Sequence, residues 1–194
     1  MGKNILMIIS GPAGSGKNTV AERLMEEFPN VERVLTSTSR PPRGQERDGA
    51  DYNFLSPEEF EKKIKAGEFY EYAKIHERYY GTSKKSISDA FSKGGDLLLI
   101  IDVQGAKTWK KIAENNPELS GRLVTIFIVP PSLDELRSRL QGRGTETEAE
   151  IERRMKTAED ELLQTKYFDA LIYSKSRDED YAALKKIYMH AKIS

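Results

Sequence analysis

A glycine-rich loop follows the first apolar segment and constrains the fold of this chain more than any other feature. The segment Ile5 to Ser10 is apolar and leads directly into the run Gly11-Pro-Ala-Gly-Ser-Gly-Lys17. Backbone N–H groups of such a loop turn inward around an anion, and the start of the following helix adds partial positive charge. The run therefore predicts a phosphate-binding loop from which Lys17 reaches the terminal phosphates of a nucleotide.

The loop matches the pattern G-x-x-x-x-G-K but departs from it at the next residue. A hydroxyl residue normally follows the lysine and ligates Mg²⁺, whereas this chain has Asn18. A glycine-rich turn before an ordinary helix is the alternative, and the helical spacing of Val20, Leu24 and Phe28 after the loop argues against it. A dinucleotide-binding loop lacks its third glycine here. The predicted nucleotide-binding residues are Gly11, Pro12, Ala13, Gly14, Ser15, Gly16, Lys17, Asn18 and Thr19.

Apolar runs separated by helical patterns predict the rest of the fold. Ile5 to Ser10, Leu97 to Asp102 and Val124 to Val129 have the composition of buried parallel strands. Strands that alternate with helices, with a phosphate loop after the first strand, predict an α/β fold of the P-loop NTPase type. It has three layers, a central parallel sheet, and its site at the carboxyl ends of the strands.

Two helices carry terminal signals in the sequence. Ser56-Pro-Glu-Glu59 combines an N-cap, a proline in the first turn and a capping-box glutamate, and this helix is expected to stop near Gly67. Ser132-Leu-Asp-Glu135 predicts a second capping box, with Gly142 just beyond the end of its helix as the C′ residue.

The length and composition predict one domain, residues 1–194, with two insertions. The core is expected to comprise residues 1–32, 84–134 and 156–194. Residues 33–83 mix hydroxyl, arginine and tyrosine side chains with short strand-like pieces and predict an acceptor-binding subdomain. Residues 135–155 form two charged helical segments and predict a mobile lid.

Charge and cysteine content exclude several function classes. Lysine plus arginine and aspartate plus glutamate each number 31, so no global basic field attracts nucleic acid. The chain has no cysteine, no basic-then-apolar leader and no long apolar run, so disulfides, export and membrane insertion are not expected. A cytoplasmic enzyme without nucleic-acid or membrane partners is the prediction.

Two groups of polar residues have the chemistry to bind a phosphorylated acceptor. The first runs from Thr36 through Arg40 to Arg43 and concentrates hydroxyl and guanidinium groups, whose planar forks match phosphate oxygens. An exposed loop with incidental arginines is the alternative. The second group, further along the chain, combines hydroxyl side chains with one carboxylate and comprises Tyr52, Glu71, Tyr80 and Thr82.

Glu71, Asp102 and the lid arginines each allow both a functional and a structural interpretation. The Glu71 carboxylate could accept hydrogen bonds from the N1–H and 2-amino groups of guanine, which adenine does not present, or it could be solvated. Asp102 ends the central apolar segment and could bind metal or substrate, or cap the next helix. The lid arginines could approach a transferred phosphoryl group or lie on solvated helix faces; they are Arg139, Arg143 and Arg154.

Taken in order, these motifs closely resemble the guanylate kinase family. Beyond the phosphate loop, the segments that carry the resemblance are residues 38–44, 51–54, 67–71, 79–82, 102–105 and 142–146, and it extends from Ile8 to about Asp169. The resemblance implies a GMP-binding subdomain at 33–83, a helical lid at 135–155, and transfer of the γ-phosphoryl group of ATP to GMP, and also to dGMP, giving ADP and GDP. It also implies Mg²⁺ as the cofactor.

The resemblance also assigns roles to individual residues. The equivalents of Arg40, Arg43 and Tyr52 hold the GMP phosphate with the help of Tyr80. The residues that recognise guanine in the family are the equivalents of Thr36, Glu71, Thr82 and Asp102. The residues that stabilise the ATP phosphates are the equivalents of Lys17, Arg139, Arg143 and Arg154.

Three departures from the family pattern concern the metal region and the adenine site. Asn18 stands where the family has serine, Ile100 where an acidic residue is usual, and Ser174-Lys175 where Asn-Asp is usual. An amide oxygen is still a hard ligand, so Asn18 is expected to hold Mg²⁺ weakly, directly or through water.

Two rival functions remain open from the sequence, which does not indicate the oligomeric state. A guanylate kinase-like domain without catalysis would use the arginine and tyrosine cluster to bind a phosphopeptide. A kinase of another small phosphorylated acceptor would keep the chemistry but would not need the guanine-recognising residues Thr36, Glu71 and Asp102.

Overall fold

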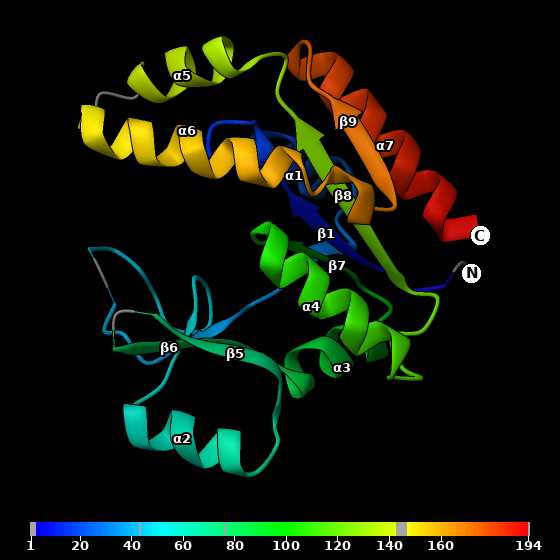
Figure 1. Cartoon of the computed structure of the whole chain (residues 1–194). Helices are drawn as coiled ribbons and strands as arrows, with labels where there is room; N and C mark the ends of the chain where they lie inside the picture. The colour runs from blue at the N-terminus through cyan, green and yellow to red at the C-terminus, as the bar shows by residue number, and fades with distance from the viewer. Residues whose placement is uncertain (1–2, 43, 76, 143–146, 194) are drawn as a thin grey trace. The chain divides into compact units, whose positions relative to one another are not determined.

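The computed structural model describes residues 3–42, 44–75, 77–142 and 147–193 (Figure 1). The predicted site residues Arg43 and Arg143 lie outside these ranges. The chain divides into two compact units, one formed by Met1–Val31 with Leu98–Ser194 and the other by Glu32–Leu97. Each unit is described by itself below. No helix in the described ranges is both long enough and apolar enough to cross a membrane.

A five-stranded sheet with the order β2-β7-β1-β8-β9 forms the centre of the fold. β1 lies parallel to β8, which lies parallel to β9. The three predicted strands correspond to β1, β7 and β8, although β7 ends two residues before Asp102. The boundary between the two units crosses β2 and β7. The strands span Leu6–Ser10 (β1), Val31–Arg33 (β2), Asp96–Ile100 (β7), Leu123–Val129 (β8) and Ala170–Tyr173 (β9).

Helices cover both faces of the strands in the first unit. α1 (Lys17–Glu27) and α7 (Arg177–Ile193) share an apolar core with Met7 and Ile9 of β1. Because side chains alternate along a strand, the intervening residues of β1 face the other side, where α4 (Val103–Glu114) packs against β1 and β8. The predicted three-layer α/β fold with a central parallel sheet is confirmed (Figure 1).

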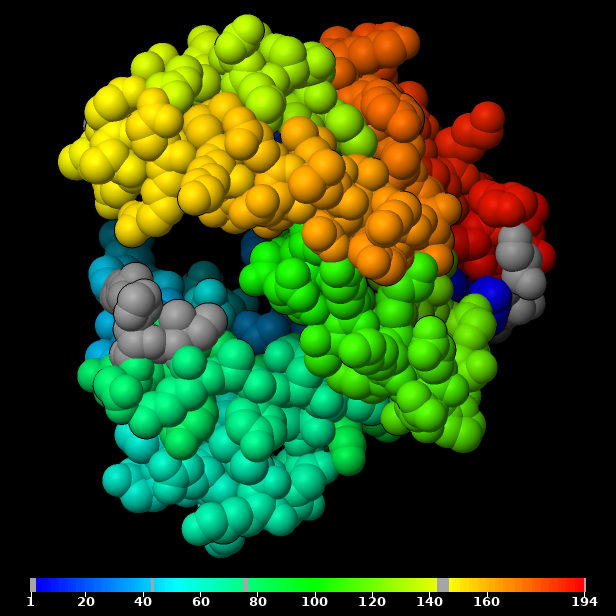
Figure 2. All heavy atoms as spheres, in the orientation of Figure 1, coloured from blue at the N-terminus to red at the C-terminus, as the bar shows by residue number. Residues whose placement is uncertain are grey.

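The segment predicted as a lid, residues 135–155, falls within a longer helix pair that has a small core of its own. α5 (Leu133–Gln141) and α6 (Glu148–Leu162) lie side by side (Figure 2), and α6 is followed by a short 3₁₀ helix, Thr165–Tyr167. Arg137 of α5 forms ion pairs with Glu148 and Glu152 of α6. These ion pairs connect the two helices. Their shared core consists of Leu136, Leu140, Ile151, Met155 and Ala158.

The capping signals at α5 are met only in part. The Ser132 side chain accepts a hydrogen bond from the Glu135 backbone N–H at 3.0 Å, as predicted. The Glu135 carboxylate instead pairs with Arg139 one turn later, so the reciprocal half of the box is replaced by an ion pair. Gly142 is the C-cap of α5 and has a right-handed conformation with φ −63°. The prediction that Gly142 is the C′ residue is therefore wrong.

The second unit contains an antiparallel hairpin with helices before and after it. Its four-stranded sheet has the order β4-β3-β6-β5. Phe60 of α2 is buried and stacks on Phe69 and Tyr79 of the hairpin, with ring centroids 4.5 and 5.2 Å away. The elements span Ser37–Thr38 (β3), Asn53–Phe54 (β4), Pro57–Lys65 (α2), Phe69–Ile75 (β5), Arg78–Ser83 (β6) and Lys84–Ser92 (α3).

The predicted start of α2 is confirmed in full. Ser56 accepts from the Glu59 N–H, the Glu59 side chain accepts from the Ser56 N–H, and Pro57 occupies the first turn. The helix ends at Lys65, just before the predicted stop at Gly67.

Candidate active site

The phosphate loop (Gly11 to Thr19) connects β1 to α1 and has the backbone that its glycines allow. Gly11, Gly14 and Gly16 have φ values of 138°, 90° and 94°, which side-chain-bearing residues rarely adopt. Gly16 is the N-cap of α1 and provides no side-chain cap, and the first turn of the helix has no acidic residue. The first N–H groups of α1 are therefore available to an anion.

Lys17 is held over the loop by the loop itself. Its ammonium group donates hydrogen bonds to the carbonyl oxygens of Gly11 at 2.6 Å and Pro12 at 2.9 Å. These contacts order a long, flexible side chain before any nucleotide binds, so the positive charge is already positioned beside the anion site. The Ser15 hydroxyl, buried in the same loop, has no hydrogen-bond partner among the described residues.

A pocket of about 400 Å³ lies beside the loop within the first unit. Gly14, Gly16 and Thr19 form one side of it, and the other lining residues are Val20, Arg139, Lys175, Arg177 and Asp180. Three of these side chains are cationic, so the pocket has the charge to receive a polyphosphate.

The departure at Ser174-Lys175 belongs to this pocket. Asp180 accepts a hydrogen bond from the Ser174 hydroxyl at 2.7 Å and from the Lys175 N–H at 2.8 Å. The Ser174 side chain is buried in this interaction. Lys175 consequently has a fixed backbone at the pocket, with its side chain at the lining.

Of the two predicted lid arginines within the described residues, Arg139 lies at the phosphate loop and Arg154 does not line its pocket. Arg139 lines the pocket and donates to Glu135 at 3.0 Å. Gly14 of the loop packs against α5, because a Cβ built there would lie 3.3 Å from Leu136. Arg154 is exposed on α6 and does not line the pocket. Arg143 lies outside the described residues.

Asp102 caps α4. Its Oδ1 accepts a hydrogen bond from the Gly105 N–H at 2.7 Å, which was the structural alternative for this residue. Glu161, near the end of α6, shares its electrostatic surroundings: burial raises the pKa of Glu161, as does the charge of Asp102, whereas Lys17 lowers it. Sequence reasoning missed Glu161, because it sits in a charged helical run without any motif.

The second unit gathers the predicted phosphate-binding residues around Arg40. The Arg40 side chain is only 7% exposed, and its guanidinium donates to the two Glu46 oxygens at 2.6 and 2.8 Å. The hydrogen bonds to Glu46 raise the pKa of Arg40 above its usual value, and the Tyr80 hydroxyl makes a smaller contribution in the same direction. Arg40 also lies over the Tyr52 ring, 5.2 Å from its centroid. Arg40, Tyr52 and Tyr80 thus form one cluster, while Arg43 is outside the described residues.

Glu46 is a site residue that sequence reasoning missed. It follows Arg40 by six positions in a segment without regular structure, so no periodicity predicts their contact. The only signal is the burial itself, because a buried guanidinium requires a carboxylate partner.

The β5–β6 hairpin brings the predicted guanine-recognising residues together. Glu71 lies opposite Thr82, whose hydroxyl donates to Glu71 Oε1 at 2.7 Å. β3, which begins directly after Thr36, pairs Ser37 with Gly81 of β6. A Cβ on Gly81 would lie 2.7 Å from the Glu71 carbonyl oxygen, so glycine permits this close approach. Glu71 and Thr82 therefore lie on neighbouring strands, β5 and β6, and Thr36 directly precedes β3, which is the other neighbour of β6.

Replacing Gly11 by alanine is expected to unfold the phosphate loop locally. The added Cβ would lie 2.6 Å from the Ile128 carbonyl oxygen, and φ is 138°. Such strain costs about 1–3 kcal/mol, so we expect a lower Tm and at least a tenfold weaker ATP affinity by calorimetry. Gly142→Ala is the control, since its φ is −63°. An unchanged ATP affinity in Gly11→Ala would contradict this prediction.

The fold and the loop define a P-loop nucleotide-binding protein, and comparisons with known proteins identify its family. The family model described as guanylate kinase matches residues 3–191. A guanylate kinase of Clostridioides difficile is 44% identical over 172 residues, which cover 89% of this chain and 80% of that protein. One from Protochlamydia amoebophila is 42% identical over 185 residues, covering 95% and 90%.

A solved structure agrees with these sequence relatives. The crystal structure of guanylate kinase from Anaplasma phagocytophilum superimposes with a TM-score of 0.73 at 28% identity and covers 100% of this chain and 89% of that one. The chain belongs to the guanylate kinase family.

Proposed function

We propose that this chain carries out the reaction of its family, transfer of the γ-phosphoryl group of ATP to GMP, through the two sets of residues described above. The products are ADP and GDP, which places the reaction in purine nucleotide metabolism. The observation that carries the proposal is the intact phosphate loop, with Lys17 ordered by the Gly11 and Pro12 carbonyls, in a member of the guanylate kinase family. We extend the acceptor to dGMP on the resemblance to the guanylate kinase family.

On the donor side, the phosphate loop binds the ATP phosphates. Its backbone N–H groups and the start of α1 receive the β- and γ-phosphates, and Lys17 neutralises the charge that builds up during transfer. Arg139 adds a second cation from α5, a role supported by its position at the pocket of the loop. Arg143 and Arg154 complete the proposed set in the lid.

On the acceptor side, the second unit binds GMP through two groups. Arg40, Tyr52 and Tyr80 bind its phosphate, supported by their clustering around one buried guanidinium, and Arg43 joins them. Thr36, Glu71 and Thr82 recognise the guanine edge, and Asp102, which belongs to the first unit, is assigned to this set by the family resemblance alone. The Thr82 hydroxyl already orients the Glu71 carboxylate, which lowers the entropy lost when guanine binds.

The chemistry requires positioning and charge neutralisation but no protein nucleophile. A GMP phosphate oxygen, already anionic at neutral pH, forms the new bond to the γ-phosphorus. The bond from that phosphorus to the β–γ bridging oxygen breaks, and ADP leaves with the electron pair. Lys17 and the lid arginines lower the barrier by stabilising the charge on the transferred group.

The donor side has ligands that suit Mg²⁺. Asn18 is exposed in the first turn of α1, where its amide oxygen is a hard ligand. Glu161 supplies a carboxylate whose pKa is raised by burial and by the charge of Asp102 and lowered by the charge of Lys17. Among the described residues no group of three or more histidine, cysteine, aspartate or glutamate side chains is arranged to hold a metal ion. When bound beside Asn18, Mg²⁺ would supply positive charge that offsets the charge of the phosphates.

Replacing Asn18 by serine is expected to strengthen Mg²⁺ binding without changing the fold. A hydroxyl at this position gives a shorter side chain that approaches the ion directly, so the Mg²⁺ concentration at half-maximal rate should fall about threefold to tenfold. The measurement is the initial rate against free Mg²⁺ at fixed ATP and GMP. Asn18→Ala should move the midpoint in the opposite direction. Equal Mg²⁺ midpoints for the native chain and Asn18→Ser would contradict the assignment of Asn18 as a Mg²⁺ ligand.

An acceptor panel tests the proposed function. ADP formation from ATP and Mg²⁺ is measured with GMP, dGMP, AMP, CMP and UMP, and without any acceptor. We expect turnover with GMP and dGMP far above AMP, and little ATP hydrolysis without acceptor. Turnover with another acceptor at the rate of GMP would overturn the assignment of guanine to Glu71 and its neighbours.

The alternative of a non-catalytic phosphopeptide-binding domain is disfavoured by the family relationship and by a phosphate loop that keeps its glycines and Lys17. GMP binding without turnover would reinstate it. We also propose a cytoplasmic location, since a chain without cysteine suits a reducing compartment.

A further inference from the structure

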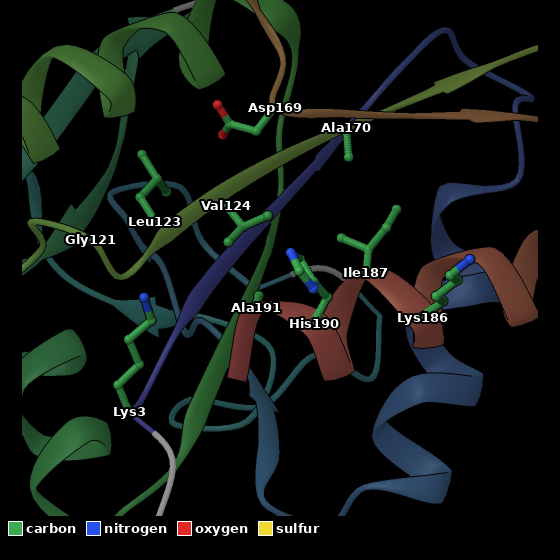
Figure 3. A pocket seen from close by; sticks show the side chains of 10 residues that line it. All are labelled: Lys3, Gly121, Leu123, Val124, Asp169, Ala170, Lys186, Ile187, His190 and Ala191. Atoms are coloured by element: carbon green, nitrogen blue, oxygen red, sulfur yellow. The ribbon is translucent and has the colours of Figure 1, made fainter. Parts of the chain in front are cut away.

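We propose that a pocket at the amino-terminal edge of the central sheet binds a small carboxylate with an apolar chain. This edge pocket has a volume of about 470 Å³ and belongs entirely to the first unit. Segments far apart in sequence form it: the residues before β1, the starts of β8 and β9, and the last turns of α7 (Figure 3). Its lining residues are Lys3, Gly121, Leu123, Val124, Asp169, Ala170, Lys186, Ile187, His190 and Ala191.

The wall of the edge pocket is apolar. Leu123 and Val124 contribute from β8, and Ala170 from β9. Ile187 and Ala191 face them from α7, and Figure 3 shows the His190 ring between Val124 and Ile187. The volume lies in the range of about 300–1,000 Å³ that small-molecule sites occupy. A flexible alkyl chain would therefore exchange water for aliphatic contacts on several sides.

The charged residues around the apolar wall favour a ligand with an anionic head group. Lys3 and Lys186 line the pocket, and both are exposed residues that carry a positive charge. Asp169, the single acidic lining residue, is already engaged by the Lys110 ammonium and by the Thr125 N–H and hydroxyl at 2.8 and 2.7 Å. Figure 3 shows its carboxylate turned away from His190 and Ile187. The unbalanced charge at the pocket is positive.

The edge pocket is separate from the phosphate loop. Leu6 of β1 pairs with Leu123 at the pocket, whereas Ser10 at the other end of β1 leads into Gly11. The length of β1, roughly 13 Å, separates the two positions along the sheet. A ligand here would bind together with nucleotides and not in place of them. The apolar wall is contributed by β8, β9 and α7 within one pocket of the size of a small-molecule site, so we commit to a free carboxylate and not to a lipid head group in a bilayer.

Octanoate binding to the chain saturated with ADP and GMP tests the proposal. Nucleotides occupy the phosphate sites, so calorimetry reports only a separate octanoate site. We expect saturable binding with one site per chain, and affinity should fall about threefold to fourfold for each methylene removed down to butyrate. Octylamine has the same chain and the opposite charge, and it should bind at least tenfold more weakly than octanoate.

Charge variants locate the site. Lys3→Glu reverses a charge at the pocket and should weaken octanoate binding at least tenfold, whereas Lys65→Glu, an exposed change in α2, should leave it unchanged. The proposal is overturned by non-saturable binding, by equal affinities for butyrate and octanoate, or by an unaltered affinity in Lys3→Glu. Binding to anionic vesicles without binding of free octanoate would also overturn it.

Discussion

Lys17→Met should lower kcat by about a hundred- to a thousandfold while the KM for GMP changes little. Methionine keeps the length of the side chain but cannot donate to the Gly11 and Pro12 carbonyls, which Lys17 contacts at 2.6 and 2.9 Å. It also removes the cation that faces the transferred phosphoryl group in the proposed mechanism. Because most of the effect belongs to the transition state, kcat and not the GMP KM should carry it.

Steady-state rates at saturating ATP, with variation of GMP, measure this prediction. Lys65→Met is the control, since Lys65 is exposed on α2 in the other unit. Lys17→Arg should retain more activity than Lys17→Met, because the charge remains although its geometry changes. Circular dichroism and Tm establish that the variants fold. A Lys17→Met enzyme with kcat within threefold of the native value would refute the role assigned to this ammonium group.

The sequence predicted best those features that depend on nearby residues. β1, the phosphate loop and α1 follow one another without interruption, so apolar character, glycine and helical spacing suffice to locate them. The capping box at Ser56 is equally local, since Ser56 and Glu59 contact each other across one turn. Burial of the apolar strands and the position of helices on both faces of the sheet then follow from their composition.

Features that depend on distant partners escaped prediction. β2 and β9 are short edge strands of the central sheet, and their partners are far away in sequence. The contact between Arg40 and Glu46 forms inside an irregular loop, and the charges of Lys17 and Asp102 influence the Glu161 carboxylate only after the chain has folded. Local patterns do not encode such pairings, because the contacts arise from tertiary packing.

Asp102 shows that a structural and a functional interpretation can hold for the same side chain. Oδ1 caps α4 through the Gly105 N–H, as the structural interpretation predicted. A carboxylate has a second oxygen with its own lone pairs, so this cap does not exhaust its capacity to accept hydrogen bonds. The cap instead fixes the orientation of the group, which a substrate-binding role at this position would require.

Glu71→Gln should lower kcat/KM for GMP by about a hundredfold and leave the weak reaction with AMP nearly unchanged. A glutamate carboxylate accepts two parallel N–H bonds from guanine, whereas glutamine offers one oxygen and turns a donor toward the other guanine N–H. The Thr82 hydroxyl, 2.7 Å from Glu71 Oε1, orients the group in both variants. The variant loses one charge-assisted hydrogen bond and gains one repulsive contact between two donors. Together these two effects account for the expected fall in kcat/KM.

The ratio of kcat/KM for GMP to that for AMP distinguishes recognition from general damage. Thr82→Val removes the orienting hydroxyl and should reduce this ratio by a smaller factor, because the carboxylate remains. Glu68→Gln is the matched control, since Glu68 precedes the same hairpin but is exposed and pairs with Lys63. If Glu71 served only to stabilise the hairpin, Glu71→Gln would lower both rates together or lower Tm without altering the ratio. A change confined to the GMP reaction instead requires direct contact with the guanine edge.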